Sequence, residues 1–268
     1  SETSTWFSGA GWTPIGNATV KFTGNYDGSD HKITGLFINR PTTDYQGLFG
    51  RVEGAYITYL SIEDVDITAQ NYGSGLAGYV DLNSHIVRCH IQGNITGRQF
   101  IGGVASFVTN SSMVEMCSAN VNVRGKFSVG GLVGSNNSSS NIYQCYSKGT
   151  VTATTSEESY YYGGLVGGNR ASVSTSFSNS IVVSGMDCGG GLAGYNSGGI
   201  YSSYSTGSVR LLDWGEAFGG LIGRNDGTVA SCYWDTESSG NPTSAAGTGK
   251  TTAEMKQQAT YVGWDFEM

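Results

Sequence analysis

Charged side chains are scarce in this chain of 268 residues. They make up 13% of it, and 14 Lys and Arg stand against 21 Asp and Glu, which gives a formal net charge of -7. A protein that follows nucleic-acid phosphates needs clustered Lys and Arg, and docking on anionic lipid needs them too, so the composition argues against both partners. No apolar run approaches the roughly 20 residues that a membrane-spanning helix needs. We therefore expect no nucleic-acid partner and no membrane span in this segment.

Ligand sets for metals and motifs for catalysis are also missing from the sequence. The three histidines, His31, His85 and His90, show no ligand spacing, and there is no CxxC pair. Neither an HExxH metallopeptidase motif nor a GxSxG nucleophile elbow is present. We expect no metal, no cofactor and no catalytic residue.

Asp and Glu are the only residues in the sequence that are candidates for a catalytic role. Asp64 and Asp66 lie two residues apart beside Glu63, and Asp27 and Asp30 flank a turn. Glycoside hydrolysis needs only two carboxylates, but the alternation around Asp64 and Asp66 is typical of a solvated strand face. A calcium ion would need six or more oxygen ligands, and nothing further in the sequence supports such a site.

Cysteine is used five times, and an odd number implies no complete disulfide framework. Cys89, Cys117 and Cys145 recur at steps of 28 residues. Because free cysteine behaves as a small buried hydrophobe, this spacing predicts a buried column of thiols rather than a metal or redox site.

Proline is nearly absent, with 3 residues, whereas glycine is abundant, with 42. The glycines mark a repeated motif, best seen as GGLVG over Gly130–Gly134. Its seven copies place their second residue at positions 47, 75, 103, 131, 164, 191 and 220, which gives steps of 28, 28, 28, 33, 27 and 29 residues. A repeat of this length marks a solenoid, a propeller or an array.

A second line of the repeat predicts the strand geometry. In its clearest copy, Ile142 precedes Cys145 by three residues, and Ser147 and Val151 follow at even steps. Even steps predict an extended strand facing the core, and the odd step before the cysteine predicts a bend or bulge. Propeller blades need about 40 residues, more than these units offer. We therefore predict an all-β parallel β-helix of about 28-residue coils, with right-handed winding because parallel crossovers nearly always have that hand.

Both ends of the chain depart from the repeat. We predict an N-terminal cap and first coil over residues 1–46, repeats over 47–240 and a C-terminal capping segment over 241–268, all in one structural domain. A capping box at Thr251 and Glu254 predicts a short helix over Met255–Thr260, and Tyr261–Phe266 is predicted to form a strand. The chain opens without a signal peptide and ends without a polar tail, which favours a fragment of a longer protein.

Four copies of the motif carry Asn two residues past the last glycine. Asn tolerates left-handed backbone and bonds its own turn, so a stacked amide ladder is expected rather than a ligand site. The four residues are Asn136, Asn169, Asn196 and Asn225.

These features resemble a known repeat. The stretch GLVGSN over Gly131–Asn136, followed by IYQCYSKGTV over Ile142–Val151, is similar to the GLUG motif, named for its Gly-Leu-apolar-Gly signature. The entry over Trp12–Gly28 and the tail over Cys232–Phe266 also resemble the ends of such arrays. The motif recurs in bacterial surface proteins, including haemagglutinin-like adhesins and non-catalytic regions of IgA-cleaving metallopeptidases. The resemblance implies an extracellular or cell-surface location and carries over no catalytic motif.

Aromatic residues supply the first candidate site. The residue directly after the cysteine position is aromatic in four coils, and His90 takes that place in an earlier one. Since the residues on either side are expected to face inward, these rings should stack outside, about 4.8 Å apart. They can form a platform for sugars, or they can simply stabilise neighbouring strands as cross-strand pairs do. The four residues are Tyr146, Phe177, Tyr204 and Tyr233.

Two corners before the motif supply the second candidate site. One is lengthened and leads to Tyr161, and the other contains Trp214. Insertions in a repeat often map to the binding face, and acidic residues mixed with aromatic ones suit carbohydrate or protein contacts. The opposite reading, in which the rings only pack onto the coil, remains equally open.

The leading hypothesis is a non-catalytic, adhesin-like module of a bacterial surface or secreted protein that binds a carbohydrate or a host protein. The first alternative is a polysaccharide-active β-helix enzyme. The second is a structural spacer or self-assembling subunit, because an uncapped solenoid end can pair with another chain.

Overall fold

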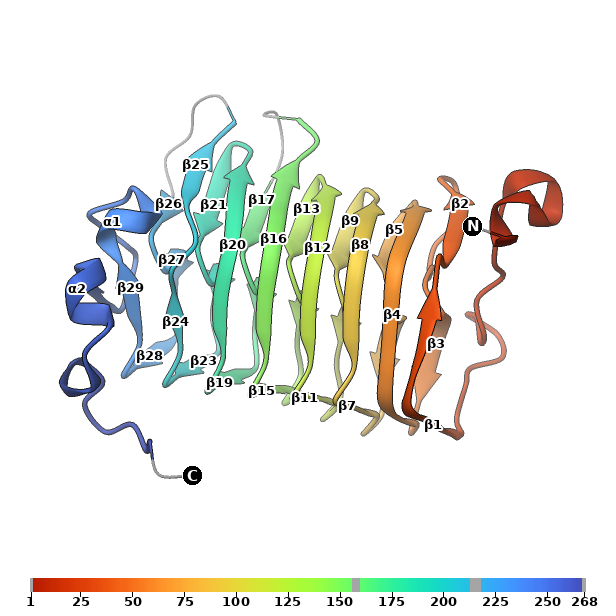
Figure 1. The fold of residues 1–268 in the computed structure, drawn as a ribbon, viewed down its shortest axis with the longest axis horizontal. Helices are drawn as coiled ribbons and strands as arrows, with labels where there is room; N and C mark the ends of the chain where they lie inside the picture. Colours follow the sequence, from red (N-terminus) through yellow and green to blue (C-terminus); the bar gives the residue numbers. More distant parts are fainter. Residues whose placement is uncertain (1, 156–159, 213–217, 267–268) are drawn as a thin grey trace.

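The chain folds into coils that stack along one axis. The computed structural model describes residues 2–155, 160–212 and 218–266. Figure 1 shows the N-terminus at one end of the stack and the C-terminus at the other. Between the named strands every pairing in the described part of the chain is parallel, and each strand pairs with the equivalent strand of the next coil, as Ala105 does with Val133. The predicted parallel β-helix is confirmed.

The described strands form three sheets that run the length of the stack. The first sheet contains the outer strands, of which β4 is the longest with 14 residues. They are β1 (Asn25–Thr34), β2 (Phe37–Arg40), β4 (Tyr56–Ala69), β8 (His90–Thr96), β12 (Ser118–Gly125), β16 (Tyr146–Ala153), β20 (Phe177–Ser184), β24 (Tyr204–Ser205), β25 (Val209–Leu211), β29 (Tyr233–Asp235) and β30 (Thr248–Lys250).

Short strands of the same sheet precede the outer strands in each coil. They are β7 (His85–Val87), β11 (Met113–Glu115), β15 (Asn141–Tyr143), β19 (Ser172–Ser174), β23 (Gly199–Tyr201) and β28 (Thr228–Ala230).

The other two sheets carry the glycine motif. The second sheet contains β3 (Phe49–Glu53), β6 (Ala77–Asp81), β10 (Ala105–Val108), β14 (Val133–Asn136), β18 (Val166–Asn169), β22 (Ala193–Asn196) and β27 (Ile222–Asn225). The third sheet contains β5 (Asn71–Ser74), β9 (Gln99–Gly102), β13 (Phe127–Gly130), β17 (Tyr160–Gly163), β21 (Asp187–Gly190) and β26 (Phe218–Gly219).

A left-handed residue makes the bend that the odd step predicts. Gln144, directly before Cys145, has φ of 52°, and Met116 holds the same place before Cys117 with φ of 50°. The side chain after the bend satisfies the backbone: the Cys145 thiol donates to the Tyr143 carbonyl (3.2 Å), and the Cys117 backbone N–H donates to the Cys145 sulfur (3.4 Å). Cysteine suits this corner because it is small and can both donate and accept.

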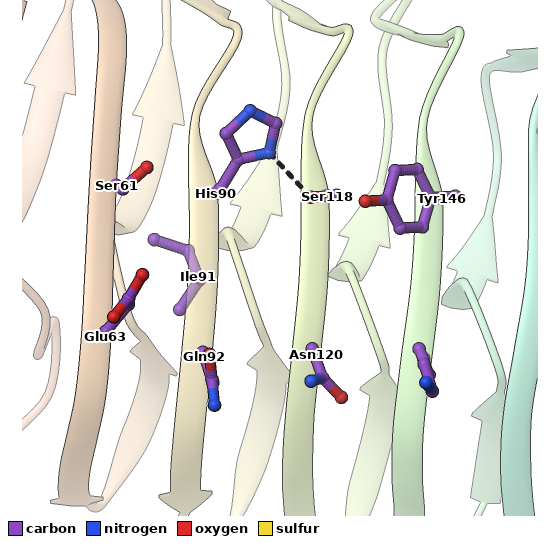
Figure 2. A pocket seen from close by; sticks show the side chains of 9 residues that line it. Ser61, Glu63, His90, Ile91, Gln92, Ser118, Asn120 and Tyr146 are labelled. Atoms are coloured by element: carbon purple, nitrogen blue, oxygen red, sulfur yellow. Dashed lines mark hydrogen bonds between the residues drawn. The ribbon is translucent and has the colours of Figure 1, made fainter. Parts of the chain in front are cut away.

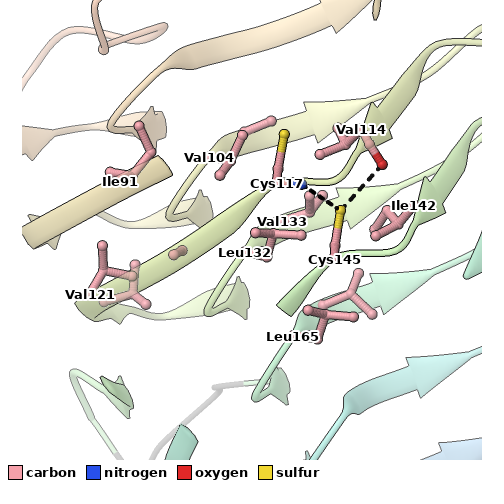
Figure 3. Close-up of a cluster of buried hydrophobic side chains, with 14 of the residues drawn as sticks. Ile91, Val104, Val114, Cys117, Val121, Leu132, Val133, Ile142, Cys145 and Leu165 are labelled. Carbon is pink, nitrogen blue, oxygen red and sulfur yellow. Dashed lines mark hydrogen bonds between the residues drawn. The ribbon is translucent and has the colours of Figure 1, made fainter. Parts of the chain in front are cut away.

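The thiols form the buried column that the sequence predicts. Cys89, Cys117 and Cys145 are free and buried, and Figure 3 shows the last two in neighbouring coils beside Leu132 and Val114. Further along, Ser176 takes the same place and accepts a hydrogen bond from the Cys145 N–H (3.0 Å). A hydroxyl therefore replaces a thiol without interrupting the column.

The motif glycines form a closely packed corner between the second and third sheets, here called the glycine corner. A Cβ on Gly131 would collide with the Gly164 carbonyl oxygen and lie 3.1 Å from the Ser147 Cβ. The Ser147 hydroxyl donates to the same Gly164 carbonyl (2.7 Å). The motif glycine Gly131 and the small residue Ser147 of the outer strand therefore both pack against the Gly164 carbonyl. The motif's Leu132 is fully buried in the core.

The predicted amide ladder is present. The Nδ2 of Asn136 donates to Asn169 Oδ1 (2.9 Å), Asn169 to Asn196 (2.8 Å) and Asn196 to Asn225 (2.7 Å). In the coil before Asn136 the equivalent residue is Val108, which is buried in the core. Asn169 and Asn225 also accept hydrogen bonds from the backbone N–H groups two residues on, at Ala171 and Gly227, so the ladder stabilises its turns as expected.

Both chain ends differ from the coils, and two of the predictions for the C-terminal end are wrong. The N-terminus begins with the 3-10 segment η1 (Glu2–Gly9), and the C-terminal segment contains α1 (Thr236–Ser239), α2 (Thr252–Met255) and η2 (Gln258–Thr260). The capping box at Thr251 and Glu254 is present, but α2 ends at Met255 and only the 3-10 turn η2 follows, so the helix predicted over Met255–Thr260 is wrong. The strand predicted over Tyr261–Phe266 is wrong, because this stretch turns back and its rings pack onto the outer strands.

The helices among the described residues are all short. No helix among them is long and apolar enough to cross a membrane. No group of three or more His, Cys, Asp or Glu side chains in the same residues is arranged to hold a metal ion.

Candidate functional site

The outward side of β4, β8, β12, β16 and β20 forms an open surface, here called the long-strand face (Figure 1). Parallel register places equivalent outward residues of successive coils in rows along the stack. One row, the ring row, holds Ser61, His90, Ser118, Tyr146, Phe177, Tyr204 and Tyr233. It contains all four aromatic residues that the sequence selects after the cysteine position.

Three of the four rings stack in sequence. The ring centroids of Tyr146 and Phe177 are 5.1 Å apart with planes 6° from parallel, and those of Phe177 and Tyr204 are 5.0 Å apart with planes 5° from parallel. These centroid distances match the strand spacing of about 4.8 Å and are typical of offset stacking. Phe177, the middle ring of the three, therefore has both faces covered by its neighbours.

The far end of the ring row is covered by the C-terminal segment. Tyr261 and Trp264 lie against both Tyr204 and Tyr233, with ring centroids between 5.3 and 6.3 Å apart. The expectation that all four rings are exposed is wrong at Tyr233, which is only 7% exposed. Burial, followed by the neighbouring Tyr261, raises the pKa of Tyr204.

The near end of the stack is open. Tyr146 is 42% exposed, and Phe177 is its stacked partner among the described residues. The next position of the row is Ser118, which interrupts the aromatic series between Tyr146 and His90. Figure 2 shows the Tyr146 hydroxyl pointing toward Ser118, whose Oγ lies 2.6 Å from His90 Nδ1. The break leaves a shallow groove of about 460 Å³.

Polar side chains complete this groove, which we call the Ser118 groove. Gln92, Asn120 and Lys148 form a second exposed row in register beside the ring row. Glu63 closes one end and pairs with Lys32 (2.9 Å). The groove thus combines one accessible ring with amide, ammonium, imidazole and hydroxyl groups, which suits a ligand that has both apolar faces and hydrogen-bonding edges.

The groove offers a poor basis for bond cleavage. Among the described residues that line it, Glu63 is the one carboxylate, whereas glycoside hydrolysis uses a pair. Asp64, which the sequence places beside it, has φ of 53° at a bulge of β4 and is exposed.

The buried thiols are also poorly suited to chemistry. Burial raises the pKa of Cys188 and of Cys232 to about 11, so both stay protonated at neutral pH. A hydrogen bond with Cys117, followed by burial, raises the pKa of Cys89 as well. Because the thiolate is the nucleophilic form, these cysteines act as packing and hydrogen-bonding groups.

The second candidate site is described only in part, because Trp214 lies outside the described residues. Tyr161 is half-buried and stacks on Tyr195 at 5.0 Å, with the Arg170 guanidinium 5.8 Å from its ring centroid. Sequence reasoning missed Tyr195 and Arg170. A signal was available for Tyr195, since the position directly after the motif also holds Tyr79 and Phe107. Tyr161 likewise shares the position two before the motif's first residue with Tyr72, Phe100 and Ser128.

Fold and surface together define a parallel β-solenoid repeat protein with an open polar and aromatic face. Residues 125–152 match the family model described as the GLUG motif. The resemblance expected from the sequence is confirmed over this segment.

Two curated proteins are similar to parts of the chain. A "Putative Gly-rich membrane protein" of Evansella cellulosilytica is 34% identical over 109 residues, which cover 37% of this chain and 12% of that protein. Halomucin of Haloquadratum walsbyi is 37% identical over 79 residues, which cover 28% of this chain and 1% of that protein. The chain therefore matches only a small part of the length of either relative.

One solved structure shares the fold over most of the chain. It is the crystal structure titled as a putative immunoglobulin A1 protease from Bacteroides ovatus. The TM-score is 0.62, and the match covers 95% of this chain and 76% of that one. At 17% identity the likeness concerns the fold alone.

Proposed function

We propose that this chain is a non-catalytic, adhesin-like β-solenoid module of an extracellular or cell-surface protein, and that its Ser118 groove binds carbohydrate. The observation that carries the proposal is the broken ring row. Tyr146 ends a stack of three rings, and its open side faces a groove lined by Gln92, Asn120 and Lys148.

Carbohydrate is favoured by the chemistry of the groove. A pyranose has apolar C–H faces that pack on an aromatic ring, and hydroxyl edges that exchange hydrogen bonds with amides and charged groups. The groove supplies the ring on one side and these polar groups in a row at the regular strand spacing, about 4.8 Å. An extended glycan lying across the strands can meet several equivalent groups in succession.

The surface location is supported by the comparisons, since one relative is named as a membrane protein and the other as a halomucin. The non-catalytic reading is supported by the single carboxylate among the described residues of the groove. Attachment to a larger protein is supported by the small share of each relative that the chain covers. The chain then serves as a binding segment on a longer surface or secreted protein.

A glycan array probed with the purified chain tests this proposal. We expect binding to a subset of glycans, lost in Tyr146→Ala and kept in Ile181→Ala. Ile181 is a matched control because it is also exposed on the long-strand face (45%) but lies outside the ring row. Absence of binding to every glycan would remove the carbohydrate reading and favour a spacer role. Equal loss in both variants would place the site elsewhere.

A further inference from the structure

A second break in a ring series lies on the third sheet. Four residues of β5, β9, β13 and β17 occupy equivalent places in successive coils, because the residues on either side of each are paired between these strands. They are Tyr72, Phe100, Ser128 and Tyr161. Their backbones are nearly identical, with φ of 56°, 54°, 52° and 67°. Ser128 thus lacks a ring between two positions that carry one, and Cys188, the next equivalent position after Tyr161, also lacks a ring.

The rings in the coils on either side of Ser128 each pack against further aromatic rings. Phe100 stacks on Tyr72 at 5.1 Å and is braced edge-on by Phe107 at 5.2 Å. Tyr161 stacks on Tyr195 at 5.0 Å. These contacts fix both rings, which line one pocket together with Ser128.

The gap has the width of one flat ring. Phe100 and Tyr161 are two coils apart, which corresponds to about 9.6 Å. A ring placed midway would lie about 4.8 Å from each wall, a typical stacking distance. It would also match the 5.1 Å between Tyr72 and Phe100 in the neighbouring coils. The space is a pocket of about 370 Å³ that is lined by both walls, by Ser128 and by Arg170.

The floor and rim of this pocket are polar. Ser128 is buried and donates to the Gly134 carbonyl (2.9 Å), and the Gln99 amide lines the edge. Arg170 is anchored through Nη1 to Ser135 Oγ (3.3 Å), and its guanidinium offers further N–H donors. Aromatic walls with a polar floor suit a ring that is apolar on its faces and polar at its edge, which describes a pyranose better than an aromatic side chain.

The pocket has one charged side chain among the described residues that line it, the Arg170 guanidinium, which reaches it from the next coil. A guanidinium binds a carboxylate through charge-assisted hydrogen bonds, so the pocket favours a ligand that carries a carboxylate.

We propose that the Ser128 slot is a second carbohydrate-binding site, which takes one carboxylate-bearing pyranose ring between Phe100 and Tyr161. Arg170 binds the carboxylate, and the Gln99 amide at the edge binds the hydroxyls. This site goes beyond the proposed function, because it lies on a different sheet from the Ser118 groove and selects for charge.

Methyl β-D-glucuronide and its neutral counterpart methyl β-D-glucoside are suitable probes, observed by proton NMR. A pyranose held between two ring faces shows upfield shifts of its ring protons and strong saturation transfer from the protein. We expect both effects for the glucuronide with the full chain. No shift and no saturation transfer with either probe would overturn the proposal, and equal binding of the two probes would overturn its carboxylate part.

Ser128→Phe is the most specific variant, because it completes the ring series on a backbone that Phe100 already adopts. It should abolish the upfield shifts while the melting temperature is kept or raised. Ser128→Ala, the matched control, leaves the slot open and should bind within roughly twofold of the original chain, since a buried neutral hydrogen bond is worth little. Unchanged binding in Ser128→Phe would overturn the proposal.

Two further variants keep the test decisive. Arg170→Gln should weaken glucuronide binding roughly tenfold and leave the glucoside unaffected, because a charge-assisted hydrogen bond is lost. If Ser128→Phe fails to fold, Tyr161→Ala removes one wall and should abolish the shifts instead. Tyr146→Ala should leave glucuronide binding unchanged, so failure of this site and failure of the Ser118 groove are distinguishable.

Discussion

The glycine corner and the long-strand face belong to the same coils, yet they tolerate different side chains. At the corner a Cβ on Gly163 would collide with the Val166 carbonyl, and one on Gly190 with that of Ala193. On the long-strand face, serine, imidazole and aromatic rings follow one another in a single row of equivalent positions. Close packing holds the first region to Gly-Gly-Leu-apolar-Gly in the four copies between Gly130 and Gly223, and solvent leaves the second free to vary. We therefore place recognition in the region that varies.

The largest effect is expected at the corner. A side chain at Gly164 would collide with the Gly191 carbonyl and the Ser178 hydroxyl, so Gly164→Val should lower the free energy of unfolding by more than about 3 kcal/mol. Urea titration followed by circular dichroism measures the loss. Asn120→Val, the same new side chain on the exposed face, should change stability by no more than about 0.5 kcal/mol. Similar losses in both variants would refute the contrast.

The amide ladder should give the next largest effect. Asn169 is buried and bonds Asn136, Asn196 and the Gly199 carbonyl. Asn169→Ala leaves these buried groups without their hydrogen-bond partner. It should lower the free energy of unfolding by about 2 kcal/mol, measured as a lower urea midpoint. Asn179→Ala, at an exposed position of β20, serves as the control. A loss in the control as large as that in Asn169→Ala would show that burial of the amide is not what matters.

A smaller effect is expected at Asp235, the residue that caps α1. Burial acts to raise its pKa, but hydrogen bonds from Thr252 and from the backbone N–H groups of Ser238 and Glu237 outweigh this, so the pKa is lowered. The stabilisation it provides is therefore present above its unfolded pKa of about 3.9 and is lost as the pH falls through the folded value. Asp235→Asn should cost about 1 kcal/mol at pH 7.

Thermal melts between pH 7 and pH 2 check this sign. The difference in melting temperature between Asp235→Asn and the original chain should shrink as the pH falls below about 4. Glu254 keeps part of the acid dependence in both proteins, because the Thr251 backbone N–H lowers its pKa. A difference that grows toward low pH would contradict the assignment.

The smallest effect on stability is expected at Tyr146. It is largely exposed and has one stacked partner, so Tyr146→Ala should cost about 1 kcal/mol or less. Differential scanning calorimetry measures the change. A large loss would mean that the ring row holds the coils together rather than serving a ligand.

Much of the fold follows from periodicity that a single sequence displays. Equal spacing of Cys89, Cys117 and Cys145 was enough to predict a stacked column, because the coils repeat in register. The Asn ladder followed in the same way from four equal positions. Glycine, cysteine and asparagine are chosen there by packing and backbone hydrogen bonds, which act identically in every coil.

The surface was less predictable because it depends on segments that do not repeat. Tyr233 belongs to the ring row, but Tyr261 and Trp264 fold back and bury it. That contact joins distant parts of the chain without any period. The same holds for the Ser118 groove and the Ser128 slot, where the informative residue is the serine that lacks a ring. Such a break becomes visible only when equivalent positions of successive coils are compared.

The most direct test of the account is to map a bound glycan onto the chain. The glycan selected on the array would be titrated into isotope-labelled protein, and backbone amide shifts would be followed by NMR. The account predicts that the largest shifts fall on β8, β12 and β16 around Ser118, while the glycine corner of β14 and β18 stays unchanged. Shifts centred on that corner instead would contradict the account.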